Sequence, residues 1–411
     1  MENLQWIDDI LAARRGGSRE PVVNTECCTK KETLPDGCVA VILELLAEGA
    51  AEKGCLKLQK AAEERLKGQV LPELPYEDAD EGTLAEMLAE ALETGGELPV
   101  EERDFVAKSN CVTTGMAMYI CAVAGRAIKT ADVAVSMNLE AIRGELGAFD
   151  KRLQELGRPY PGQIESAENV RRVTAGSKLT TDEGRYAFGY DKKPRVQDAI
   201  CVRATPQTHG GVRDIFHWCA AQVASDWNSH AHTLYRTEYA MDALATALAD
   251  LAHTSERRSF RLCDTRLSYG LPMNLVPDEL GINYGFPIIQ STQAAETAEL
   301  KLLALPAAAI KRKNVSLAYY SVSKLFELIR KLNRVMAVEI LMSAQALDIV
   351  HAKIPGYPCG AGTAAAHKCL RGEISMMDEN RFVAPDMIAA ERLTADGVIL
   401  KAVEAAVGTL K

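Results

Sequence analysis

The sequence predicts an all-α protein, built as a bundle of long near-parallel helices. Residues 212–269 and residues 307–354 contain neither glycine nor proline, so both runs lack the residues that break helices. Apolar side chains in the second run, such as Val322, Leu325 and Ile329, recur at helical spacing and define a stripe. The sequence shows no alternating strand pattern of useful length and no strand–glycine-loop–helix unit. Helices of this length usually form a bundle and often bury another face against neighbouring subunits.

We expect two regions along the chain, 1–108 and 109–411. The first region contains one apolar stretch, Cys38–Ala50, followed by an acidic segment that prolines interrupt and that holds one short helix, Thr83–Glu93. The second region is predicted to be a continuous helical body whose last helix covers Thr394–Leu410.

The amino-acid composition argues against several classes of function. The chain has 411 residues, 47% hydrophobic and 25% charged, with a net charge of −9, as in an ordinary globular protein. The acidic balance argues against nucleic-acid binding, because phosphates need a basic surface. Charges interrupt the apolar stretches, and the first fifteen residues lack the apolar core of a signal peptide. We therefore expect a cytoplasmic protein that does not enter a membrane.

Eleven cysteines, an odd number with no C-x-x-C pair, predict reduced thiols rather than a disulfide framework or a zinc site. Only the adjacent pair Cys27 and Cys28 has an arrangement that suggests reactivity, and a structural role is the more common one. His230 and His232 form an H-x-H, but such positions do not face each other on a helix. A metal site needs three or four convergent ligands, so none is predicted.

Motifs with a known mechanism are absent: the sequence has no phosphate loop, no H-E-x-x-H and no nucleophile elbow. Six longer phrases nevertheless occur in order. They are NLEAIRGELGAFD (138–150), PGQIESAENVRRVTAGS (161–177), RVQDAICVRATPQTHG (195–210), SERRSFRLCD (255–264), GINYGFPIIQ (281–290) and DENRFVAPDM (378–387). Through them the chain resembles the histidine and phenylalanine ammonia-lyase family, the aromatic amino-acid lyases, from about Asn110 to Leu410. The resemblance implies a homotetramer in which several subunits meet at each active site.

The family's electrophile is a methylidene-imidazolone ring, formed when an internal Ala-Ser-Gly cyclises. This sequence contains no Ala-Ser-Gly and no Ser-Gly dipeptide. Aligning Val39–Gly49 with the family helix that follows the triad puts Lys31, Glu32 and Thr33 at the triad. None of these can form the ring, so we expect no cofactor. About thirty residues precede this position, too few for the family's lid-bearing segment, which is therefore expected to be largely missing.

Three positions match the family's substrate-binding residues, and a fourth departs from them. Asn110 matches the family's asparagine. Gln197 and Arg203 match the glutamine and arginine of the family phrase Q-D-x-Y-x-x-R, in which Ile200 replaces the tyrosine. Two of them have a structural alternative: Arg203 in an ion pair with a nearby carboxylate, and Asn110 as a helix cap.

Three further positions differ from the family. His232 falls where a phenylalanine stands in the family phrase Asn-Phe-His-Gly, and Lys311 and Arg312 replace an acid or amide pair. These changes make the predicted pocket more cationic and less aromatic. A surface location is the alternative for all three.

We hypothesise a lyase-like enzyme that works without the ring, by elimination, addition or isomerisation beside a carboxylate. Arg203, Asn110 and Arg312 would bind a polar amino acid or related small carboxylate, and Gln197 would orient it. Lys311 or His232 would act as base, or Lys311 as Schiff-base nucleophile. The alternative is a non-catalytic relative, or a subunit that completes another lyase's active site.

Overall fold

The computed structural model describes residues 33–76, 79–93, 96–193, 195–229, 233–278, 280–310 and 315–411. Helices connected by turns and loops make up this part of the chain, and its β-pairing is confined to isolated bridges. The all-α prediction is therefore confirmed. Two compact units form, each from several segments: 1–124, 216–245 and 305–327 in the first, and 125–215, 246–304 and 328–411 in the second.

The first unit contains the helices of the N-terminal third. They are α2 (Asp36–Lys53), α3 (Leu56–Gly68), α4 (Glu81–Leu92) and α5 (Val100–Lys108). The apolar stretch expected at Cys38–Ala50 is α2, which ends where Gly54 adopts a left-handed conformation with φ 72°. The short helix expected at Thr83–Glu93 is α4, and the Asp80 carboxylate caps it by accepting the Thr83 amide.

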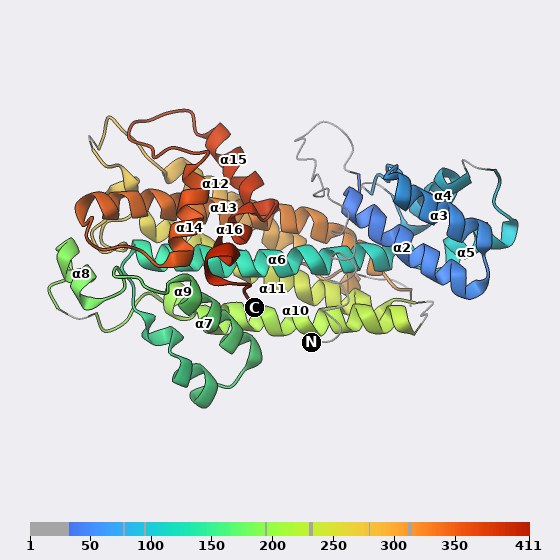
Figure 1. Cartoon of the computed structure of the whole chain (residues 1–411), viewed down its shortest axis with the longest axis horizontal. Coiled ribbons are helices and arrows are strands. Elements are labelled where there is room, and N and C mark those ends of the chain that lie inside the picture. The colour runs from blue at the N-terminus through green and yellow to red at the C-terminus, as the bar shows by residue number, and fades with distance from the viewer. Residues whose placement is uncertain are drawn as a thin grey trace. The chain divides into compact units, whose positions relative to one another are not determined.

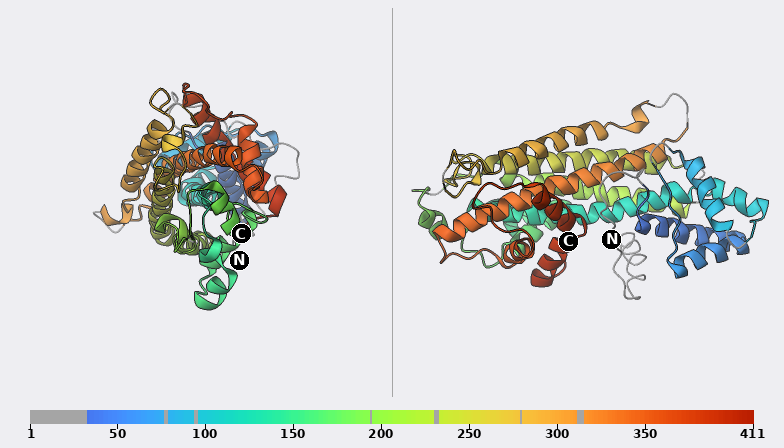
Figure 2. Two further views of the ribbon diagram at one scale, coloured as in Figure 1. Left: turned by 90° about the vertical axis from the view of Figure 1, so that its left-hand side faces the viewer. Right: turned by 90° about the horizontal axis from the view of Figure 1, so that it is seen from above.

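Four long helices contribute residues to both units: α6 (Cys111–Ala141), α10 (Thr205–Asn228), α11 (Tyr235–Leu262) and α13 (Ala318–Lys353). The second unit adds α7 (Pro161–Val173), α8 (Asp182–Phe188), α9 (Ile200–Arg203), α12 (Pro287–Leu303), α14 (Ala361–Arg371), α15 (Ala384–Ala395) and α16 (Val398–Val407). Within that unit the long helices run nearly parallel (Figure 1), and both views of Figure 2 agree. This is the predicted bundle.

Two predicted helices are divided in the structure. The run 212–269 holds the end of α10 and all of α11, although no breaker residue marks the division. The Asp226 carboxylate near the end of α10 accepts hydrogen bonds from the Thr237 amide and hydroxyl, both 2.9 Å, and so caps the start of α11. At the C-terminus, Gly397 (φ 71°) separates α15 from α16, so the single helix expected at Thr394–Leu410 is wrong.

The expectation that charges interrupt every apolar stretch also needs correction. Helices α6 and α13 are long and apolar enough to cross a membrane by length and composition alone. However, 72% and 78% of their most apolar windows are buried inside the protein. Such burial is typical of core helices in a globular bundle, which pass the same test.

All nine cysteines in the described part of the chain are free thiols. Burial raises the pKa of Cys111, Cys121 and Cys263 to about 12, which makes them poor nucleophiles. Cys27 and Cys28 lie outside the described residues. The division of the chain between residues 108 and 109 stays a prediction.

A buried carboxylate joins three helices of the second unit. Asp132 of α6 pairs with Arg213 (2.5 Å) and His209 Nδ1 (2.8 Å) of α10, and it accepts hydrogen bonds from Ser166 and Asn169 of α7. All five side chains are buried. Burial by itself would raise the pKa of Asp132, but Arg213 and His209 outweigh that effect and lower it to about 2. The carboxylate is therefore charged throughout the physiological range.

We predict that Asp132→Asn destabilises the protein by about 3–5 kcal/mol, because it removes the buried counter-ion of Arg213 and leaves only the more distant Glu165, at 3.6 Å. Urea denaturation measures the loss. Asp150→Asn is the control, since Asp150 forms an exposed pair with Arg152 whose contribution is small. Equal stability of the two variants would contradict the role of Asp132.

Candidate active site

The predicted residues Gln197 and Arg203 lie on one short segment of the second unit. It consists of residues 195–199, without regular structure, and the single helical turn α9. Gln197, Ile200 and Arg203 are spaced three residues apart along the chain. Gln197 is exposed, and Ile200 keeps 68% of its surface exposed although it is apolar. Along the chain, the segment thus carries an amide at Gln197, an apolar side chain at Ile200 and a guanidinium at Arg203.

Arg203 is a partly buried cation that has no carboxylate partner in the part of the chain that the structure describes. Its Nη1 donates a hydrogen bond to the backbone oxygen of Asp198 at 2.5 Å, and among the described residues no carboxylate lies within ion-pair distance. The ion pair that we considered as the structural alternative is therefore not present in the described part of the protein. A guanidinium has five N–H donors, so Arg203 keeps most of its capacity to bind an anion.

Other arginines of the same unit show the opposite arrangement. Arg258 pairs with Glu339, Arg213 with Asp132, and Arg195 with Asp198 at 3.2 Å. These three guanidinium groups are at most 4% exposed, and a carboxylate compensates each of them, as burial of a charge requires. Arg203 differs from these three arginines in having no carboxylate partner among the described residues. It shares this with Arg143, whose buried guanidinium donates to the backbone carbonyls of Ala141, Ser268 and Tyr269.

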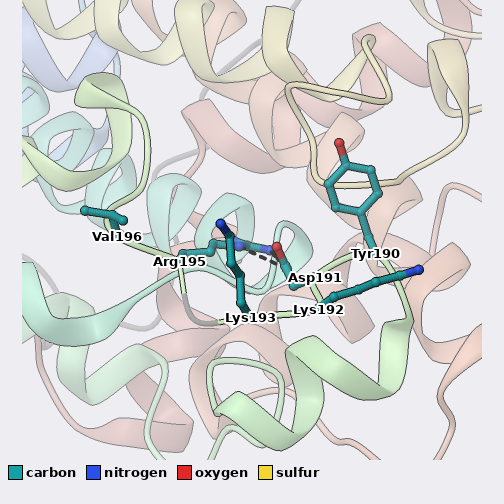
Figure 3. Close-up of a pocket in the computed structure, with 6 residues that line it drawn as sticks. All are labelled: Tyr190, Asp191, Lys192, Lys193, Arg195 and Val196. Atoms are coloured by element: carbon teal, nitrogen blue, oxygen red, sulfur yellow. Dashed lines mark hydrogen bonds and ion pairs between the residues drawn. The ribbon is translucent and has the colours of Figure 1, made fainter.

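The loop before α9 is held by Arg195. Its guanidinium pairs with Asp191 (2.7 Å) as well as Asp198, and it lies over the ring of Tyr269, 3.5 Å from the centroid. Figure 3 shows Arg195 directed at Asp191, while the ends of Tyr190 and Lys192 point away from it.

An open hollow of about 380 Å³ lies along this loop, lined by Tyr190, Asp191, Lys192, Lys193, Arg195 and Val196. Its only buried cation, Arg195, is already neutralised, and the two lysines are exposed. The hollow is therefore a solvent-exposed surface beside the α9 segment. Arg203, which does not line it, is the cation of the candidate site that has no described carboxylate partner.

Asn110 lies in the first unit, directly before α6. Its carbonyl accepts the Thr114 amide at 3.0 Å, so it occupies the position at which the helix begins. Its φ is 53°, a left-handed conformation that asparagine tolerates better than most residues. Backbone strain of this kind clusters at functional sites. The structure thus adds a conformational reason to single out Asn110.

The remaining predicted site residues, His232, Lys311 and Arg312, lie outside the described residues, and their roles stay predictions. Asp198 was not singled out from the sequence, although its buried side chain and its carbonyl both contact arginines of this segment. The sequence places Asp198 three residues after Arg195 and five before Arg203, which could have suggested contacts with both. Spacing alone does not reveal that the Asp198 side chain is buried.

The chain is similar to known proteins both in sequence and in structure. The profile described as "Aromatic amino acid lyase" matches residues 85–233 and 234–372. The histidine ammonia-lyase of Sorangium cellulosum is 31% identical over 394 residues, covering 86% of this chain and 70% of that protein. The histidine ammonia-lyase of Alkaliphilus oremlandii is 33% identical over 303 residues, covering 68% of this chain and 57% of its own length.

Solved structures agree on the fold. Tyrosine aminomutase from Streptomyces globisporus superposes with a TM-score of 0.80 at 22% identity, over 95% of this chain and 85% of that one. Histidine ammonia-lyase from Trypanosoma cruzi gives 0.75 at 20% identity, over 98% and 88%. The matched profile covers more than half of the chain, and the relatives align across both units. The chain belongs to the aromatic amino-acid lyase family.

Proposed function

We propose that this protein is a lyase-family enzyme that binds a polar amino acid or a related small carboxylate and acts without the methylidene-imidazolone ring. The observation that carries the proposal is Arg203, a partly buried guanidinium that no described carboxylate neutralises. Paired hydrogen bonds from a guanidinium are the usual way in which proteins grip a carboxylate. Membership of a family named for amino-acid substrates supports the same class of ligand.

In the proposed reaction, Arg203 and Asn110 hold the substrate carboxylate and the Gln197 amide orients it. A base, Lys311 or His232, removes a proton from carbon near the carboxylate, and the leaving group departs from the adjacent carbon or is added there in the reverse direction. Lys311 and Arg312 would add positive charge to the pocket. This charge favours a polar, anionic substrate over phenylalanine, tyrosine or histidine.

The family's ring cofactor does not fit the residues of this chain. Thr33, aligned with the last residue of the triad, forms a backbone bridge with Pro75 just before α2 begins at Asp36. No Ser-Gly dipeptide occurs among the 411 residues, and the cyclisation needs one. We therefore derive no step through the ring, and the proposed substrate must carry a leaving group that departs without it.

The same missing triad favours a second candidate, a non-catalytic relative or a subunit that completes the active site of another lyase. Co-expression with a full-length lyase separates the two. A stable hetero-oligomer that gains activity would support the second candidate, whereas turnover by this chain alone would support the enzyme.

Arg203→Lys tests the carboxylate site. The substitution keeps the charge but loses the paired hydrogen bonds, so ligand affinity should fall about tenfold, or about 1.4 kcal/mol, with little change in melting temperature. A thermal-shift panel of amino acids and small carboxylates, headed by L-glutamate and L-aspartate, measures both. Arg152→Lys, in an exposed pair, is the matched control. Unchanged affinity in Arg203→Lys would refute the carboxylate site.

Intact-protein mass spectrometry tests the absence of the ring. We expect the mass of the purified protein to equal the mass of its sequence, because no triad can cyclise. Formation of the ring would release two water molecules, and a deficit of that size would overturn this part of the proposal.

We propose that the protein assembles as a homotetramer, alone or with a related subunit. The support is the family resemblance and a set of exposed apolar side chains on the described surface, including Leu156, Val196 and Ile200. Light scattering at micromolar concentration should give a multiple of 44.7 kDa. A monomer would contradict the proposal.

A further inference from the structure

We propose that Asp198 is a positioning residue that sets the orientation of the Arg203 guanidinium for a substrate carboxylate. The inference rests on the proposed role of Arg203. Asp198 would touch no substrate. Its side chain fixes one peptide group, and that peptide group holds Arg203.

The Asp198 side chain is 1% exposed and bonded through both oxygens. Oδ2 accepts the backbone amide of Glu145 at 2.5 Å, and Oδ1 accepts Arg195 Nη1 at 3.2 Å. The carbonyl of the same residue accepts Arg203 Nη1 at 2.5 Å. Anchored on two sides, the Asp198 main chain cannot rotate freely, so its carbonyl points at Arg203 in a defined direction.

The groups that anchor Asp198 are themselves fixed. Arg195 is clamped between Asp191 and the Tyr269 ring, and the Tyr269 carbonyl accepts Arg143 Nη2 at 2.6 Å. On the other side, Gly144 makes room for the carboxylate. A Cβ atom at Gly144 would lie only 2.9 Å from Asp198 Oδ2 and 2.4 Å from Leu139 Cδ1. A residue larger than glycine there would displace the carboxylate from the Glu145 amide.

This arrangement has a consequence for the chemistry of Arg203. Because Nη1 is used by the Asp198 carbonyl, Nε and Nη2 remain available, and these two form the side-on fork that matches the two oxygens of a carboxylate. The contact also fixes the plane of the guanidinium before a ligand arrives, which lowers the entropy cost of binding.

A helix-capping role does not account for Asp198. The residue that caps α9 is Ala199, whose carbonyl accepts the Val202 and Arg203 amides. The recorded hydrogen bonds of the Asp198 carboxylate go instead to Glu145 and Arg195, on other segments. The Asp198 contacts therefore hold the α9 segment and Arg203 in position, and they do not cap the helical turn itself.

A double-mutant cycle tests the proposal, with calorimetric binding of L-glutamate as the probe. Asp198→Asn keeps one acceptor oxygen and should still fold, but we expect it to weaken binding about tenfold, as Arg203→Lys does. If Asp198 acts through Arg203, the double variant should be no weaker than the weaker single variant. Independent losses that multiply to about a hundredfold would overturn the proposal.

Asp226→Asn is the matched control. Asp226 is also a buried carboxylate that accepts a backbone amide, but it lies in the first unit, and its recorded hydrogen bonds go to Thr237. It should lower the melting temperature and leave L-glutamate affinity unchanged. If Asp198→Asn behaves in the same way, its role is merely structural and the proposal is wrong.

A second readout needs no ligand. Phenylglyoxal modifies arginine side chains, and peptide mass spectrometry can follow Arg203 alone. Asp198→Asn should raise the rate at Arg203 several-fold, because the backbone carbonyl that holds the guanidinium is no longer anchored by the carboxylate, while the rate at exposed Arg152 stays constant. An unchanged rate at Arg203 would refute the proposal even if L-glutamate does not bind. By contrast, L-glutamate binding that Arg203→Lys does not weaken would refute the proposed carboxylate site instead.

Discussion

The second unit depends on the carboxylate of Asp132, which is buried in the middle of α6. Four side chains from α7 and α10 converge on its two oxygens, and Arg213 supplies the charge that makes its burial tolerable. A carboxylate without these partners would take up a proton, since desolvation raises its pKa. The helices are therefore packed in the one arrangement that brings a cation, an imidazole, a hydroxyl and an amide to the same point.

The same network continues to the candidate site. Burial lowers the pKa of His209, so its neutral ring can donate from Nδ1 to Asp132 while Nε2 faces Arg258 at 3.4 Å. Arg258 pairs with Glu339 of α13 and donates to the carbonyl of Cys201, the second residue of α9. A chain of buried polar contacts thus links the core of the bundle to the short helix that carries Arg203. Rigid support of this kind is what a binding residue requires.

The charge on Arg203 differs from every other charge in this network, since the described part of the chain provides no carboxylate for it. Family membership and this unpaired guanidinium point to the same class of ligand, a small carboxylate. The departures from the family, above all the missing Ser-Gly dipeptide, concern what happens after binding. Our proposal therefore separates the two: the chain keeps a carboxylate-binding residue of the family and differs in the chemistry that follows binding.

The sequence by itself determined the fold class and the family, because breaker-free apolar periodicity and six ordered phrases are local properties of the chain. It also singled out Gln197 and Arg203 as candidate substrate-binding residues, and that role stays a prediction. Only the tertiary structure decided that Arg203 has no described carboxylate partner and that Asp198 is buried between Glu145 and Arg195. Pairing and burial depend on which segments pack together, often far apart in sequence. A linear pattern identifies a charged residue, but the surrounding fold determines whether that charge is neutralised or left to bind a ligand.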